Sequence, residues 1–152
     1  MKVDTTRFGI LDVDESSVIN MPRGPLGFEE MTRFITIQHR PDTEFRWLQC
    51  VDEPSLAFVV VDPSVFVENY DIEISDAEAE MLHLTNEGDA FVLAIVTISN
   101  GGRMITLNLA APVVVNSKTM TGMQVILQDN RYSVRHQLTE VVSETKATVK
   151  AA

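Results

Sequence analysis

Hydrophobic residues occur along most of this chain in short runs, each closed by turn residues. In FRWLQC (45–50) apolar and polar residues alternate, which is typical of a half-exposed strand. LAFVVV (56–61) is apolar throughout, which indicates a strand buried on both faces that ends at Asp62-Pro63. RFGILDV (7–13) resembles a tight hairpin around Gly9, and further runs with strand character are SVINM (17–21), RFITIQ (33–38) and YSVRHQL (132–138).

Two pairs of apolar runs are separated by turn sequences and predict β-hairpins. AFVLAIVTIS (90–99) and RMITLNLAAP (103–112) flank Asn100-Gly101-Gly102, and these three residues tolerate positive φ. VVVN (113–116) and MQVIL (123–127) flank the turn sequence SKTMTG.

One segment has the signature of a helix. Ser75-Asp76-Ala77-Glu78 matches a capping box, and Asn86 and Gly88 are expected to end the helix soon afterwards. Because short strands dominate the rest of the chain, we predict an all-β fold. The expected architecture is a small closed or nearly closed antiparallel β-barrel-like domain with one short α-helix.

The stretch PRGPLGFEE (22–30) predicts a rigid corner between two strands. Pro22 and Pro25 restrict φ, and we expect Gly24 and Gly27 to supply positive φ. Phe28 is expected to point inward and hold the corner in place.

Residues 1–138 contain no linker and no internal repeat, so they are predicted to form one domain. Residues 139–152 have few large apolar side chains, and we expect a flexible, dispensable tail. The start MKVDTTRF lacks the apolar run of a secretory signal, and the longest apolar run, 90–98, is about half as long as a membrane-spanning helix. These features predict a cytoplasmic protein without membrane contact.

Charge is distributed unevenly along the chain. The net charge is −10, and residues 52–89 hold eleven Asp or Glu without one Lys or Arg. Such a segment repels phosphate backbones, so direct nucleic-acid binding is not expected. Two interpretations stay open: an ordinary solvated acidic face, or a surface that binds a basic protein.

The sequence contains no pattern that predicts catalysis, a cofactor or a metal. It lacks the phosphate-binding GxxxxGK and the nucleophile elbow GxSxG. His39, His83 and His136 have no ligand partners at helical spacing, and Cys50 lies in a strand pattern that predicts burial without activation. We therefore interpret the chain as a binding module and not an enzyme.

Two other binding functions remain possible from the residues alone. A β-barrel can hold a small ligand, although the sequence shows no cluster of converging polar groups for one. The mildly basic C-terminal part, with Arg131, Arg135 and His136 near Tyr132, would be the site of direct RNA binding.

A series of short motifs spans nearly the whole chain. In order, they are TRFG (6–9), PRGPLGFEE (22–30), WLQ (47–49), LAFVVVDPSVFVENYDIEI (56–74), VLAIVTI (92–98), NLAAPVVVN (108–116), GMQVIL (122–127) and the closing Tyr132, Arg135-His136 and Leu138. Together they resemble the FliW family of flagellar assembly factors, which are small bacterial cytoplasmic proteins. The chain departs from many relatives in having Pro25 directly after the first glycine of the corner.

The resemblance implies a function that composition does not. Members of this family bind the carbon storage regulator CsrA, a small basic dimer that represses translation by holding messenger RNA, and they relieve that repression. They also bind newly made flagellin, so that flagellin in excess releases the regulator and stops flagellin synthesis. The resemblance further implies a barrel-like fold without cofactor or catalytic residues.

The acidic composition of residues 52–89 and the resemblance to the FliW family together indicate that the residues after LAFVVV bind a partner. An RNA-binding regulator must be electropositive, which suits an anionic surface. Aromatic side chains surrounded by charge are typical of interfaces. The predicted partner-binding residues are Asp62, Pro63, Phe66, Glu68, Tyr70, Asp71 and Glu73.

Overall fold

The structure is a computed structural model that describes residues 1–138 and 148–151. Its strands are β1 (Lys2–Thr5), β2 (Gly9–Asp12), β3 (Ile19–Asn20), β4 (Arg33–Ile37), β5 (Arg46–Cys50), β6 (Ala57–Val61), β7 (Asp71–Ile74), β8 (Ala90–Ser99), β9 (Met104–Asn116), β10 (Thr121–Gln124), β11 (His136–Gln137) and β12 (Thr148–Ala151). The helix α1 spans Asp76–Met81, and the 3₁₀ turns are η1 (Glu15–Ser17), η2 (Pro63–Val65), η3 (Glu87–Asp89) and η4 (Asn100–Gly102).

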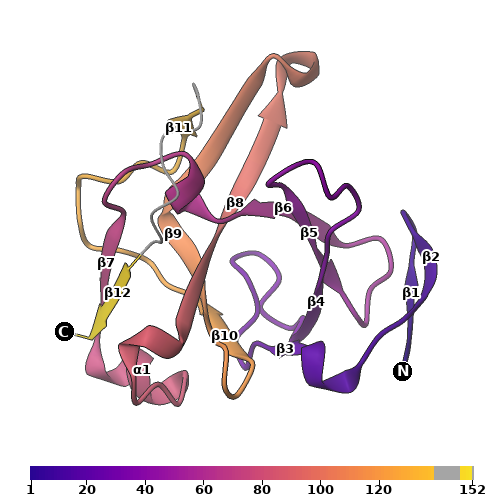
Figure 1. Ribbon diagram of the computed structural model, residues 1–152, viewed down its shortest axis with the longest axis horizontal. Helices are drawn as coiled ribbons and strands as arrows, with labels where there is room; N and C mark the ends of the chain where they lie inside the picture. The colour runs from indigo at the N-terminus through magenta and orange to yellow at the C-terminus, as the bar shows by residue number, and fades with distance from the viewer. Residues whose placement is uncertain (139–147, 152) are drawn as a thin grey trace.

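Seven strands form a ring, in the order β10, β3, β4, β5, β6, β8, β9 and back to β10 (Figure 1). All neighbours are antiparallel except β10 and β3, which pair in parallel through Thr121 and Asn20. The predicted all-β, barrel-like architecture is confirmed. The hairpins predicted at 90–112 and 113–127 are present, and their turns contain positive φ at Asn100, Gly101, Gly102 and Met120. The hairpin expected around Gly9 lies slightly earlier, because Gly9 pairs with Thr5 and the turn is at residues 6–8.

Strand β9 separates two hydrophobic cores because its side chains alternate between the faces of the sheet. Val113 and Val115 point into the ring, where they pack with Phe34, Leu48 and other side chains of the ring strands. Val114 points outward, into a second core that β7 and the region after α1 cover. The second core contains Tyr70, Ile72, Ile74, Leu82, Leu107, Leu109 and Val149.

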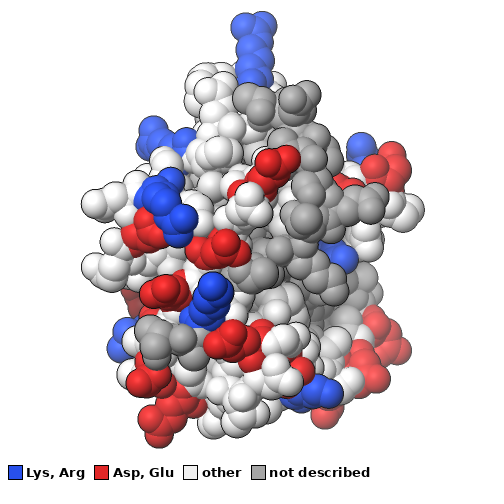
Figure 2. Space-filling view, turned by 60° about the vertical axis from the view of Figure 1, so that its left-hand side comes forward, with Lys and Arg blue, Asp and Glu red and all other residues white. Residues whose placement is uncertain are grey.

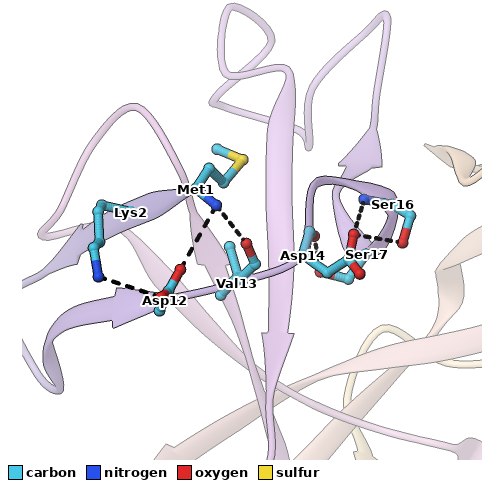
Figure 3. A network of polar contacts seen from close by, with 7 residues as sticks. All are labelled: Met1, Lys2, Asp12, Val13, Asp14, Ser16 and Ser17. Atoms are coloured by element: carbon cyan, nitrogen blue, oxygen red, sulfur yellow. Dashed lines mark hydrogen bonds and ion pairs between the residues drawn. The ribbon is translucent and has the colours of Figure 1, made fainter.

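The β1–β2 hairpin lies beside the ring, and polar contacts connect its two ends (Figure 3). The amino group of Met1 donates to the carbonyl of Val13 at 2.7 Å and lies 3.7 Å from the carboxylate of Asp12. Asp14 caps η1 by accepting from the backbone and the hydroxyl of Ser16. These bonds hold the turn that leads from the hairpin into β3.

The capping box at the start of α1 is confirmed: Ser75 accepts from the backbone of Glu78, and Glu78 accepts from the backbone of Ser75. The predicted end of the helix was placed too late. His83 adopts φ +56°, and the backbone bonds Leu84 to Ala79 and His83 to Glu80 close the helix in a Schellman motif.

The corner at residues 22–30 is held by its own backbone, since Gly24 donates to Glu29 and Phe28 donates to Pro25. Gly27 has φ +86°, as predicted. Gly24 is needed for another reason: a Cβ there would collide with the carbonyl oxygens of Phe28 and Met31. Phe28 is not inward-pointing, because its side chain is 41% exposed, and its ring meets that of Phe58 edge-on.

The expectation of a flexible tail is wrong for its last residues. Thr148–Ala151 form β12, which runs parallel to β7, and Val149 is buried at 5% exposure in the second core. The sequence did not predict this because four residues acquire strand structure here only through a partner that is distant in the chain. Residues 139–147, also part of the expected tail, lie outside the described residues.

Candidate functional site

The predicted partner-binding residues follow β6 and extend through β7, and the structure distributes them between surface and core. Asp62 is exposed and caps η2, where its carboxylate accepts from the backbone of Ser64 at 3.0 Å and from its hydroxyl at 2.7 Å. Pro63 is buried. Phe66 is half-buried and stacks on Phe45 with ring centroids 5.9 Å apart.

Tyr70 is a core residue, which corrects its predicted role as an aromatic contact for a partner. Its side chain is 1% exposed, its hydroxyl donates to the carbonyl of Leu109, and its ring meets that of Tyr132 edge-on at 4.7 Å. Burial, with a smaller contribution from the nearby phenol of Tyr132, raises the pKa of Tyr70 well above its ordinary value.

The exposed members of the predicted set are acidic. Glu68 precedes β7, and within β7 the carboxylates of Asp71 and Glu73 face solvent while Ile72 and Ile74 face the second core. The two acids therefore share one face of the strand. Lys150 of β12 lies opposite Glu73 in the register and is itself exposed.

A groove of about 650 Å³ runs beside β7. One wall consists of β7 and the start of α1, and the other consists of residues 126–132, with Lys150 also reaching the groove. Its carboxylates come from Asp71, Glu73, Glu78 and Asp129, and its cations from Arg131 and Lys150. Figure 2 brings the left-hand side of Figure 1 forward and shows acidic and basic side chains interspersed on this face instead of one continuous acidic patch.

Tyr132 connects the two walls of this groove. Its hydroxyl accepts from the backbone N–H of Asp71 at 3.1 Å and donates to the carbonyl of the same residue at 3.0 Å. The guanidinium of Arg131 lies over the Tyr132 ring, 5.1 Å from its centroid, and pairs with Asp129 at 2.6 Å. That pairing lowers the pKa of the Asp129 carboxyl and raises that of Arg131.

The described residues offer neither a grouped set of metal ligands nor a membrane-spanning helix. Among residues 1–138 and 148–151, no group of three or more His, Cys, Asp or Glu side chains is arranged to hold a metal ion. Cys50 is buried and free. In the same described residues, no helix is long and apolar enough to cross a membrane. Arg131, a candidate for RNA binding, is already paired with Asp129.

The sequence did not predict that residues 126–132 form the second wall of the groove. Ile126 is 56% exposed although it lies in a predicted strand, and Tyr132 bonds to a residue 61 positions earlier. No local pattern marks these residues, because the groove exists only where β7 approaches the segment after β10.

Fold and groove together define the class, which is a small β-barrel domain with two added two-stranded sheets and an open groove beside one of them, the β7–β12 sheet. The family model described as "FliW protein" matches residues 2–138. The chain therefore belongs to the FliW family of flagellar assembly factors.

Individual relatives agree with this assignment. The flagellar assembly factor FliW of Syntrophus aciditrophicus is 37% identical over 138 residues, which cover 91% of this chain and 87% of the relative. That of Geotalea uraniireducens is 40% identical over 146 residues, covering 96% and 88%. A crystal structure of the flagellar assembly factor FliW superposes with a TM-score of 0.83 at 31% identity, covering 95% of this chain and 100% of the other.

Proposed function

We propose that this protein is a cytoplasmic partner switch in flagellar assembly. It binds the translational regulator CsrA and relieves its repression of flagellin synthesis, and it also binds flagellin. It acts by binding alone, without catalysis or a cofactor. When flagellin accumulates, flagellin occupies the protein and the released regulator shuts down flagellin translation.

The observation that carries this proposal is the exposed acidic face of β7 in a chain of the FliW family. Asp71 and Glu73 project from the strand, and Asp62 and Glu68 lie exposed before it. An RNA-binding regulator presents positive charge, and complementary charge increases the rate at which two proteins associate. We assign the regulator interface to these acids, with half-buried Phe66 beside them. Tyr70 and Pro63 are left out of this interface because both are buried.

Association kinetics with purified CsrA test the proposal. The double variant Glu68→Lys/Glu73→Lys should slow association about tenfold at low salt, and the difference should shrink as salt screens the charges. Glu15→Lys/Glu30→Lys is the matched control, because it changes the net charge equally at exposed acids far from β7 in the sequence. Equal rates for the two double variants would assign the interface elsewhere. If the unaltered protein does not bind CsrA, the proposed function is wrong.

Flagellin binding is tested by competition. Adding monomeric flagellin to the complex of this protein with CsrA should release CsrA in a concentration-dependent manner. A stable ternary complex without release would contradict the switch. A gel shift with flagellin leader RNA distinguishes the RNA-binding alternative, which requires this protein to bind that RNA in the absence of CsrA.

A further inference from the structure

The edge of β7 that faces away from β12 has no strand partner in the described residues 1–138 and 148–151. Asp71 donates its N–H to Tyr132 and Ser75 donates its N–H to Glu78, so neither of these N–H groups bonds to β12. In an extended strand, alternate residues present their backbone groups to the same edge. Glu73 lies midway between those two residues, so its N–H and C=O point to this outer edge as well.

The opposite wall of the groove presents a second edge of the same kind. Val125 donates its N–H to Pro112 and Leu127 donates to Ala110, each at 2.8 Å, so both bonds point toward β9. By the same alternation, the backbone groups of Ile126 point away from β9. Ile126 and Glu73 both line the groove, which is therefore a gap between two extended backbone edges.

The charges along this gap favour a basic occupant. Four carboxylates and two cations line it, and one of the cations, Arg131, is already paired with Asp129. Exposed Ile126 adds an apolar surface on the far wall. An extended segment placed in the groove thus meets backbone donors and acceptors on both sides, carboxylates and one large apolar side chain.

We propose that this groove is a strand-addition site for an extended, basic segment of a protein partner. The segment pairs with the outer edge of β7 at Glu73 and with the edge of residues 125–127 at Ile126, and its Lys or Arg side chains bind the carboxylates of the groove. This inference rests on the proposed function for the identity of the partner, the regulator CsrA, but its test does not.

Tyr132 already occupies one position of this edge. Its hydroxyl both accepts from and donates to the backbone of Asp71, as a residue of a neighbouring strand would. The Tyr132 contact therefore closes the edge at Asp71 and leaves the position at Glu73 for the partner segment. Added strands gain affinity from the main-chain hydrogen bonds and specificity from side chains at alternate positions.

The direct test uses an octapeptide of alternating valine and lysine, with blocked ends, added to the full chain. We expect saturable binding, and the amides of Glu73 and Ile126 should exchange with solvent about tenfold more slowly in its presence. An octapeptide of alternating valine and glutamate should not bind. The lysine peptide N-methylated at every second residue should lose binding, because it cannot donate to one of the two edges. Binding that leaves both amides unaffected, or no binding, would overturn the proposal.

Two single variants separate the groove from general charge attraction. Glu73→Lys should weaken binding of the lysine peptide about fivefold, whereas Glu30→Lys, which adds the same charge at an exposed position outside the groove, should change it less than twofold. Equal weakening by both would show that the peptide responds to net charge and not to this site. Melting curves of both variants must match that of the unaltered protein.

The same exchange measurement with CsrA distinguishes the two proposals. Protection of Glu73 and Ile126 by both the peptide and CsrA supports both. Protection by the peptide without any binding of CsrA leaves the strand-addition site intact and overturns the proposed function. Binding of CsrA without protection of these amides assigns the regulator to another surface and overturns CsrA as the occupant of the groove.

Discussion

The hydroxyl of Tyr70 donates a hydrogen bond to the carbonyl of Leu109, so the start of β7 is fixed to β9 from inside the second core. The aromatic residue nearest the predicted acidic interface is therefore a structural anchor. Its role is to position the exposed acids of β7, Asp71 and Glu73, over the barrel wall.

Tyr70→Phe should lower the free energy of unfolding by about 1–3 kcal/mol at neutral pH, because the buried carbonyl of Leu109 loses its donor. The pKa of Tyr70 is raised in the folded state, so its contribution is complete below about pH 10 and is lost as the pH rises further. Urea titrations at several pH values should show a flatter alkaline loss for the variant. If the free energy of unfolding falls equally with rising pH in both proteins, the conclusion that the Tyr70 phenol is buried is wrong.

Val149→Asp should destabilise the protein by about 1.5–3 kcal/mol, because Val149 is the side chain through which β12 enters the second core. Deletion of residues 139–152 should cost a similar amount. Lys150→Ala, at the next and exposed position, should stay within about 0.5 kcal/mol. Thermal melts that coincide for the deletion and the full chain would restore the view of a dispensable tail.

Gln49→Leu should cost about 2–3 kcal/mol, because the buried Gln49 amide donates to the carbonyls of Cys50, Pro54 and Leu56 and these would lose a partner. The turn from β5 to β6 should then exchange its amides faster. Gln38→Leu is the control at an exposed position. Urea unfolding that is unchanged in Gln49→Leu would show that water replaces the amide.

His83→Gly should stabilise the protein by about 0.5 kcal/mol, since glycine adopts the left-handed conformation of this helix terminus at less cost. The side chain of His83 is exposed, so little packing is lost. A melting temperature above that of the unaltered chain is expected, and a lower one would reveal a stabilising contact of the imidazole.

The sequence by itself determined the elements whose signals are local. Alternating and apolar runs, the turn at Asn100-Gly101-Gly102 and the capping box at Ser75 predicted the strands, a hairpin and the helix, because each depends on residues that are neighbours in the chain. The motifs along residues 6–138 likewise pointed to the FliW family, and the acidic run singled out residues 62–73 as a candidate partner-binding surface.

Tertiary structure decided the rest, because it depends on contacts between residues far apart in the sequence. Tyr70 and Glu73 have the same acidic surroundings in the sequence. Tyr70 is buried because it packs against Leu109, whereas Glu73 is exposed. Thr148–Ala151 form a strand only because β7 offers an edge for pairing. The groove between Glu73 and Ile126 arises from the distance that packing leaves between two segments, and no single segment encodes it.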